Sequence, residues 1–356
     1  MAEEDPNAAL PGPPASAAAA PVAPPVPADR RSDTGEIPAP GYTEPISVAR
    51  AGVRRRLGET DLRVYPAALS TKVFGWTVDR QSAMGILDRY HLLGGNLLDT
   101  DPAYGAGHSQ TMVGSWLHSR HARDRMVVAT RVGRDPERPG LRRRRMHAAV
   151  DASLTRLQTD HVDLLFLALD DPEIPLEDTL ASAHELIAAG KVRELGAVGY
   201  SAGRLTEARV LSSYGLPKLS AIQVPYSLMN RSAYEGDLEL LAAGQGLGVL
   251  PLYPLAHGFL SGQYRSRADG VGSARRERAG QYIGRRGSRV LGALGRIAQV
   301  HQVTPATIAL AWLLTKRGMV APVASADDLS HVDAMIGAAD VRLSRAQVAD
   351  LERASA

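Results

Sequence analysis

The sequence predicts a single (β/α)8 TIM barrel that begins near residue 53. Eight short apolar or β-branched runs alternate with eight stretches of helical periodicity, which is the pattern of consecutive βα units. Most of the apolar runs are continuous, as expected for parallel strands that are covered on both faces. The segment from residue 53 to residue 356 is also long enough for one such barrel, which takes about 250 residues or more.

The predicted strands are short and rich in Val, Leu, Ile and Ala. They span residues 64–71, 96–99, 126–130, 162–168, 193–198, 220–224, 247–252 and 319–324. The predicted helices follow them, near residues 80–93, 108–119, 141–157, 175–189, 204–213, 234–243, 288–302 and 327–338. The third helix is representative, because Met146, Val150 and Leu154 recur on one face and arginines lie on the other.

The first 45 residues differ from the rest of the chain. They are rich in proline and alanine and contain few large apolar side chains. Such a segment cannot bury enough surface to offset the entropy lost on ordering. We therefore expect a disordered, solvated tail over residues 1–45, followed by one barrel domain over residues 53–356.

The composition of the chain limits the classes of partner that we expect for it. The chain of 356 residues is 44% hydrophobic and 22% charged, which is typical of soluble globular proteins. No apolar run reaches the ~18 residues of a membrane span, and the acidic N-terminus leads into no apolar signal region. We therefore expect a cytoplasmic protein without a membrane partner. The net charge of +3 is small and the basic residues are scattered, so we expect no nucleic-acid partner.

Two absences in the sequence exclude further chemistry. The chain contains no cysteine, which rules out disulfides, thiolate metal sites and cysteine nucleophiles. Histidines and carboxylates show no spacing typical of metal ligands, so we expect no metal. In a (β/α)8 barrel the functional side chains lie at the C-terminal ends of the strands. The positions of interest are therefore Asp99, Arg131, Ala168, Gln223 and Tyr253.

Five sequence blocks follow these strand ends in order. They are GGNLLDTDPAYGAGHSQTMVGSWL (94–117), SLTRLQTDHVDLL (153–165), GKVRELG (190–196), IQVPYSLMNR (222–231) and PLAHGFLSGQY (254–264). Together they resemble the aldo-keto reductase superfamily over roughly residues 53–353. The FGWTVD stretch (74–79) and the long loop after the seventh strand resemble its long-loop, sugar-ketone-reductase-like branch. The resemblance implies hydride transfer from NADPH to a small carbonyl compound.

The resemblance implies a catalytic tetrad that this sequence retains only in part. Asp99 and Tyr104 have the family's spacing, and Tyr104 would protonate the developing alkoxide. Arg131 stands where the family has its lysine, and Ala168 where it has its histidine, so the tetrad is degenerate. Arginine keeps the positive charge of lysine and can pair with Asp99. Its planar guanidinium group, however, holds that charge at a different position from a lysine ammonium. Alanine has no donor for an oxyanion.

The resemblance also implies a dinucleotide site. Gln223 is retained from the residues that hold the nicotinamide. Tyr253, Leu255 and Gly258, in and next to the PLAHG block, are the further cofactor-binding candidates.

Other cofactor positions differ from the family pattern. Residues 198–199 read Val-Gly instead of the usual Ser-Asn pair. Asp327 and Asp328 stand where relatives grip the 2′-phosphate of NADP, and carboxylates would repel a phosphate. The arginine-rich residues 265–289 are candidates to compensate, because arginine forks suit phosphate oxygens.

Three further side chains are candidates at the barrel mouth. Lys72, after the first strand, is a second candidate catalytic cation, although a rim lysine reaching solvent is the preferred interpretation. His108 and His257 are candidates to replace the missing histidine, with local hydrogen bonding preferred for both. We expect Arg131 rather than Lys72 to lower the pKa of Tyr104, because Asp99 is placed to orient the guanidinium.

Three functions remain open from the sequence. The first is an NADP(H)-dependent reductase of a small carbonyl, such as a sugar ketone, weakened by the loss of the tetrad lysine and histidine. The second is a non-catalytic barrel that binds a ligand or partner. The third is a repurposed non-redox enzyme that uses Tyr104 and Arg131 as an acid and a cation, for example in dehydration or cyclisation.

Overall fold

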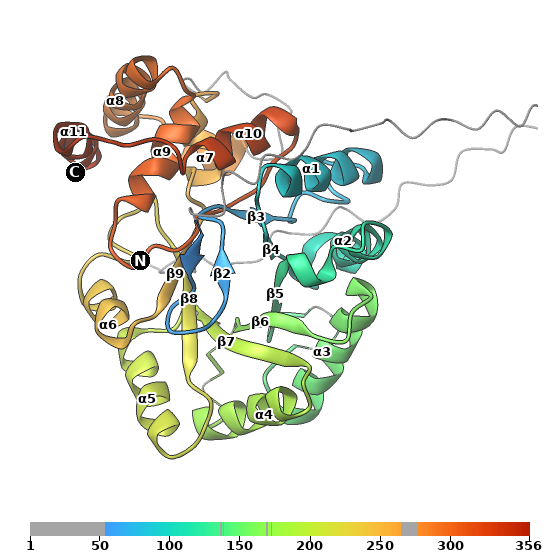
Figure 1. Ribbon diagram of the computed structural model, residues 1–356. Helices are drawn as coiled ribbons and strands as arrows, with labels where there is room; N and C mark the ends of the chain where they lie inside the picture. Colours follow the sequence, from blue (N-terminus) through green and yellow to red (C-terminus); the bar gives the residue numbers. More distant parts are fainter. Residues whose placement is uncertain (1–53, 136, 138, 169, 172, 265–275) are drawn as a thin grey trace, which may run out of the picture. The chain divides into compact units, whose positions relative to one another are not determined.

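Eight parallel strands close into a barrel in the computed structural model, which describes residues 54–356 except 136, 138, 169, 172 and 265–275 (Figure 1). The order around the barrel is β10-β3-β4-β5-β6-β7-β8-β9. The strands are β3 (Ala68–Ser70), β4 (Leu97–Asp99), β5 (Val127–Val132), β6 (Val162–Leu167), β7 (Val192–Val198), β8 (Leu219–Pro225), β9 (Gly248–Leu252) and β10 (Val323–Ala324). The predicted (β/α)8 fold is confirmed. The tail expected over residues 1–45 lies outside the described residues.

Helices surround the barrel and follow its strands along the chain (Figure 1). They are α1 (Arg80–Leu92), α2 (His108–Ser119), α3 (Arg143–Leu157), α4 (Leu176–Ala188), α5 (Ala202–Ser213), α6 (Asp237–Gln245), α7 (Arg276–Gly280), α8 (Arg285–His301), α9 (Pro305–Leu314), α10 (Leu329–Gly337) and α11 (Arg345–Ser355). The eight predicted helices correspond to α1–α6, α8 and α10.

Two of the longer helices were not predicted, for different reasons. Seven consecutive residues of α9, from Thr307 to Leu313, are buried, so the helix has no polar face and no amphipathic period. Helix α11 carries a capping box in which Ser344 and Gln347 bond each other's backbone, a signal that the sequence does display.

The predicted first strand, residues 64–71, is wrong in extent. It is divided into the end of β2 (Arg63–Val64), which pairs with β1 (Arg55–Arg56) in an antiparallel hairpin, and β3, which begins after Pro66. Proline lacks the amide hydrogen that a continuous strand would use. The hairpin sends Leu57, Leu62 and Val64 into the cluster that fills the barrel interior.

A glycine lets this hairpin approach the barrel closely. Gly58 has a positive φ of 54°, and a β-carbon there would lie 2.3 Å from the Ser220 carbonyl oxygen. The hairpin thereby covers the N-terminal ends of the strands and leaves the opposite end for the site.

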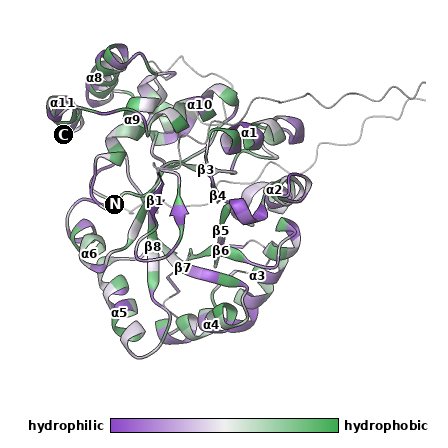
Figure 2. Ribbon diagram, viewed as in Figure 1, coloured by the Kyte–Doolittle hydropathy of each residue, from purple (hydrophilic) through white to green (hydrophobic). Residues whose placement is uncertain are grey.

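The apolar residues form two clusters. One fills the barrel and the other lies between the strands and the surrounding helices. The helices carry both hydrophobic and hydrophilic residues (Figure 2). Among the described helices, none is by itself long and apolar enough to cross a membrane; α8 and α9, bent by 93°, pass that test only as a pair.

Candidate functional site

Two adjacent strands, β4 and β5, and a third farther round the barrel, β8, bring polar side chains to its C-terminal end. Asp99 is the last residue of β4, Arg131 the next-to-last of β5, and Gln223 lies in β8. Their exposed fractions are 1%, 7% and 1%. Burying a charged group such as Asp99 or Arg131 costs free energy unless the group is paired. The hydrogen bonds among these side chains therefore decide whether the folded protein tolerates them here.

Arg131, Asp99 and Gln223 form a closed triangle. Nη2 of Arg131 donates to both carboxylate oxygens of Asp99, at 2.8 and 3.0 Å, and to Oε1 of Gln223 at 2.7 Å. Nε of Arg131 donates to the same Gln223 oxygen at 3.1 Å. The Gln223 amide nitrogen in turn donates to Asp99 at 2.7 Å. The predicted pairing of Arg131 with Asp99 is confirmed, and charge-assisted bonds of this kind are the strong ones.

Tyr104 joins this network through the other end of the guanidinium. It opens a short 3-10 turn (Tyr104–Gly107) after β4, and its hydroxyl oxygen accepts a bond of 2.9 Å from Nη1 of Arg131. The same nitrogen reaches the Thr100 carbonyl and an Asp101 carboxylate oxygen, both at 3.4 Å. All five N–H groups of Arg131 are therefore directed at acceptors of the protein itself.

Burial dominates the acidity of Tyr104. It raises the pKa of the phenol well above the usual value, Arg131 lowers it, and the charges of Asp99 and Asp101 raise it further. The expectation that a neighbouring cation lowers this pKa overall is wrong, because desolvation and two carboxylates outweigh one guanidinium. Burial also acts against the charge of Arg131, but Asp99, Tyr104 and Asp101 outweigh it and raise the pKa of Arg131. Arg131 therefore stays charged.

Asp101 is a member of the site that the sequence analysis missed. Its side chain is only 14% exposed, and burial raises the pKa of its carboxyl despite the opposing charge of Arg131. A signal was present, because two aspartates in DTD end a buried strand and are two residues apart.

Lys72 lies beside the site rather than inside its network. Its ammonium is 5.4 Å from the ring centroid of Tyr253, within the range of a cation–π contact, and its charge acts on Asp101. The cation that lowers the pKa of Tyr104 is Arg131. The geometry thus favours Arg131 over Lys72 as the partner of Tyr104.

The residues after β9 form an aromatic row in a strained turn. The rings of Tyr253 and His257 are 4.6 Å apart, and that of His257 stacks on Tyr282 at 6.5 Å. Tyr253, Ala256 and His257 all have positive φ, an unusual backbone for residues with a β-carbon. Strain of this kind is concentrated at binding sites.

Leu255 and Gly258, the other predicted cofactor residues of this block, belong to the same turn. The Gly258 amide donates to the Leu255 carbonyl, and Gly258 has a φ of 95°. The His257 ring packs against Tyr253 and Tyr282, and His108 is exposed at the start of α2.

Four positions that depart from the family pattern lie at the ends of the strands. Ala168, at the position of the tetrad histidine, and Val198 are buried apolar residues at the ends of β6 and β7. Asp328 caps α10, accepting from the His331 amide at 3.0 Å, and Asp327 accepts from the Thr77 hydroxyl at 2.9 Å. Both carboxylates are thus held at the end of β10.

Part of the arginine-rich loop over residues 265–289 lies outside the described residues. In its described part, the Arg286 guanidinium donates to the carbonyls of Ser355, Leu228 and Met229, which is a structural role. Within the described ranges, no group of three or more His, Asp or Glu side chains could hold a metal ion.

Comparison with known proteins identifies the family. The model of the Aldo/keto reductase family matches residues 68–356. The chain belongs to the aldo-keto reductase family. This aldo-keto reductase is 30% identical to norsolorinic acid reductase stcV of Emericella nidulans over 310 residues, which are 82% of this chain and 78% of that protein. It is 28% identical to Protein tas of Escherichia coli, over 83% of this chain and 96% of that protein. The resemblance drawn from the sequence blocks is confirmed.

Proposed function

We propose that this aldo-keto reductase reduces a small carbonyl compound, with Tyr104 as the proton donor and Arg131 as its supporting cation. The observation that supports this proposal is the 2.9 Å bond from Arg131 to the Tyr104 hydroxyl, in a network anchored by Asp99. Because Arg131 donates, the phenol keeps its own hydrogen for another acceptor. Among the described residues, no acceptor is bonded to that hydrogen, so it is available for a substrate oxygen.

The network determines how each side chain would act. Tyr104 transfers its proton to the carbonyl oxygen as negative charge develops there. Arg131 stabilises the phenolate that remains, and Asp99 with Gln223 holds the guanidinium in place. Since every N–H of Arg131 is already bonded, Arg131 acts through Tyr104 and not directly on the substrate.

The family implies a nicotinamide dinucleotide, NADP(H), which supplies the hydride when bound. The Tyr253 ring, half-buried at the end of β9, is a suitable planar surface for such a ring. The Gln223 amide oxygen accepts from Arg131 and its nitrogen donates to Asp99, and the Val198 side chain offers no polar atom. Asp327 and Asp328 do not fit an additional 2′-phosphate. The side chains at the site therefore suit the nicotinamide ring of the cofactor. They do not suit the 2′-phosphate, which is the group that distinguishes NADP from NAD.

The aromatic residues after β9 also suggest a substrate class. The row of Tyr253, His257 and Tyr282 favours a planar, aromatic carbonyl over the sugar ketone that the branch suggests. One relative, 29% identical over 77% of this chain, is named an aryl-alcohol dehydrogenase, from Pestalotiopsis microspora. We propose weakened turnover, because Ala168 supplies no oxyanion donor and such a loss costs about 10²–10³ in rate.

Cofactor titration is the direct test. NADPH and NADH are each titrated while the protein's tryptophan fluorescence is followed, and oxidation of the bound cofactor is then measured with 4-nitrobenzaldehyde and with a ketose. We expect saturable binding and slow turnover, faster with the aromatic substrate. Absence of binding of both cofactors at millimolar concentration would contradict the proposal.

A non-catalytic, ligand-binding barrel is the second candidate. The observation that favours it is that the N–H groups of Arg131 are all directed at side-chain and backbone oxygens of the protein itself. In that case 4-nitrobenzaldehyde or the cofactor would bind without any oxidation of NADPH or NADH.

A further inference from the structure

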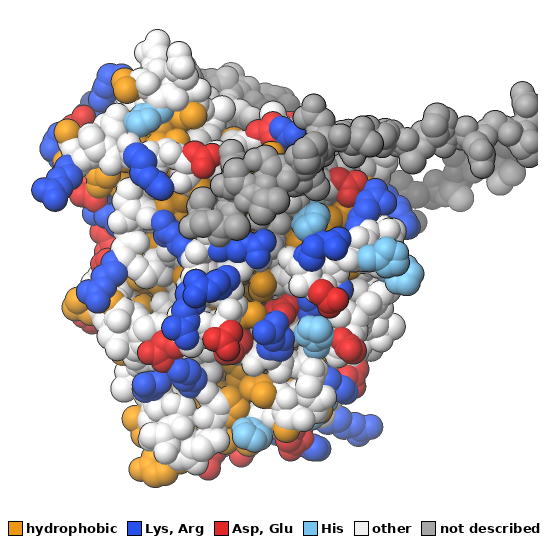
Figure 3. All heavy atoms as spheres, viewed as in Figure 1, with side chains coloured by type: hydrophobic (Ala, Val, Ile, Leu, Met, Phe, Trp, Pro, Cys, Tyr) orange, Lys and Arg blue, Asp and Glu red, His pale blue; other side chains and the backbone are white. Residues whose placement is uncertain are grey.

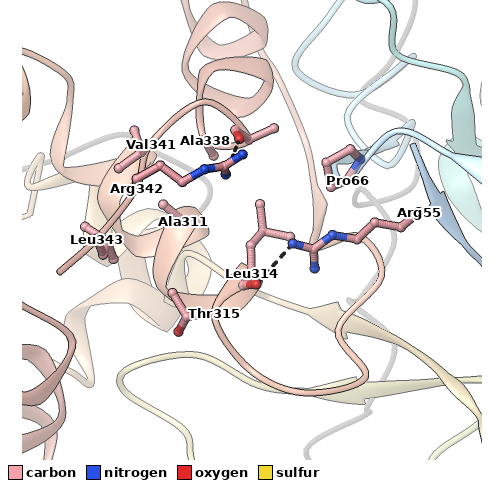
Figure 4. Close-up of a pocket in the computed structure, with 10 residues that line it drawn as sticks. Arg55, Pro66, Ala311, Leu314, Thr315, Ala338, Val341, Arg342 and Leu343 are labelled. Atoms are coloured by element: carbon pink, nitrogen blue, oxygen red, sulfur yellow. Dashed lines mark hydrogen bonds between the residues drawn. The ribbon is translucent and has the colours of Figure 1, made fainter. Parts of the chain in front are cut away.

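A cavity of about 380 Å³ lies outside the catalytic network. It is bounded by β1, the segment before β3, α9 and the connection from α10 to α11 (Figure 4). Its walls carry the aliphatic residues Pro66, Leu314, Val341 and Leu343 beside three polar ones, Arg55, Thr315 and Arg342. Aliphatic side chains thus lie next to two arginines, and the volume of the cavity is in the range of small-molecule sites.

The two guanidinium groups are not paired with any carboxylate. Arg55 donates to the carbonyls of Met319 at 2.6 Å and Leu314 at 3.1 Å, and Arg342 donates to the Ala339 carbonyl at 3.1 Å. In the described part of the chain neither arginine forms an ion pair, and no acidic residue lines the cavity. Among the residues that the structure describes, backbone carbonyl groups are therefore what these two positive charges bond to.

The charges also affect each other. Burial lowers the pKa of Arg55, and the charge of Arg342 lowers it further, as expected for like charges that face one space. The guanidinium groups extend into this space from opposite walls (Figure 4). Arg342 uses one N–H group in its bond to the Ala339 carbonyl, which leaves four for a ligand.

We propose that this cavity binds a small organic anion, with its carboxylate or phosphate oxygens between Arg55 and Arg342 and its apolar body against Leu314, Val341 and Leu343. The fork of N–H donors on arginine matches both kinds of oxygen group. An anion would relieve the repulsion between the two arginines. On the face shown in Figure 3, Lys and Arg side chains lie across the middle of the molecule with Asp and Glu side chains among them.

Isothermal titration of the full chain tests the proposal. The probes are benzoate, phenyl phosphate and inorganic phosphate, so that the two sources of anionic oxygen and the contribution of the apolar body are separated. We expect benzoate or phenyl phosphate to bind more tightly than inorganic phosphate. Arg342→Gln should weaken the tighter of the two at least tenfold, because Arg342 is exposed and its loss leaves the fold intact.

Arg345→Gln is the matched control, since Arg345 is an exposed arginine of α11 that does not line the cavity. It should leave binding unchanged. Three outcomes would overturn the proposal: no binding of any probe at 10 mM, binding that Arg342→Gln does not weaken, or equal weakening by Arg345→Gln. None of these readouts uses carbonyl reduction, so failure here is distinct from failure of the proposed function.

Discussion

Arg131 donates a hydrogen bond to the hydroxyl oxygen of Tyr104 across 2.9 Å, from a guanidinium that simultaneously holds both oxygens of Asp99. This bond links a phenol of raised pKa to a buried, permanently charged group. The stability of the site and its proton chemistry therefore depend on the same side chain, and they can be separated by mutation.

Replacing Tyr104 by phenylalanine should abolish carbonyl reduction. The substitution removes the proton donor, which is worth about 10²–10⁴ in rate. Unfolding temperature should change little, because Nη1 of Arg131 retains acceptors on Thr100 and Asp101. Steady-state rates and thermal melts provide the measurement, with exposed Tyr214→Phe as the control. Carbonyl reduction that persists in Tyr104→Phe would exclude this mechanism.

Arg131→Met and Lys72→Met should behave differently. Arg131→Met leaves the Asp99 carboxylate buried without its cation, so we expect a loss of about 3–5 kcal/mol in the free energy of unfolding together with loss of activity. Lys72→Met removes a cation–π contact with Tyr253 and a charge that acts on Asp101, but no bond to Tyr104 or Asp99, so it should affect both properties less. Urea unfolding and rate measurements distinguish the two variants. Adding Asp99→Asn to Arg131→Met should recover stability but not activity. Inactivation by Lys72→Met alone would assign the supporting cation to Lys72 instead.

The double substitution Arg131→Lys with Ala168→His should raise kcat. It restores the residue types of the family tetrad, adding a donor for the oxyanion at the end of β6. Each tenfold increase would correspond to ~1.4 kcal/mol of activation free energy. Single-turnover rates under saturating cofactor are the appropriate measurement, with each single variant beside the double. A double variant no faster than the original protein would show that the missing donor does not limit the reaction.

The pH dependence of reduction should show no alkaline decline up to about pH 10. Burial raises the pKa of Tyr104 above its ordinary value near 10, so the phenol remains protonated and able to donate. Oxidation of the alcohol needs the phenolate and should rise with pH over the same range. Rate profiles in both directions between pH 6 and pH 10 test this. A reduction rate that falls with an apparent pKa near 8 would mean that Tyr104 is much more acidic than its surroundings imply.

Asp101→Asn should stabilise the protein at neutral pH. Burial raises the folded-state pKa of this carboxyl above its unfolded value of about 3.9, so the protonated form favours folding. That contribution is fully present below about pH 3.9 and is lost as pH rises through the folded-state pKa. The gain from asparagine should therefore grow from pH 4 to pH 8 in urea unfolding, whereas exposed Asp61→Asn should show no such trend. A gain that is constant across this range would assign the effect to packing instead.

Much of the fold and the meeting of the site residues could be predicted from the sequence. The C-terminal ends of parallel strands lie together, so Asp99, Arg131 and Gln223 had to meet once the strands were placed. Helix α9 could not be predicted, because its buried residues leave no periodic pattern. The direction of the Tyr104 pKa shift could not be predicted either. It depends on side-chain burial and on the approach of Asp101, which the order of the strands does not determine.

The full engagement of the Arg131 guanidinium has an evolutionary consequence. One side chain satisfies a carboxylate of β4, an amide of β8 and the phenol, so positions 99, 131 and 223 are epistatic. Lysine at position 131 has three N–H groups in place of five and would leave acceptors unsatisfied in the buried triangle. A lineage with arginine here would return to lysine only through less stable intermediates, and relatives that share the arginine should inherit its partners with it.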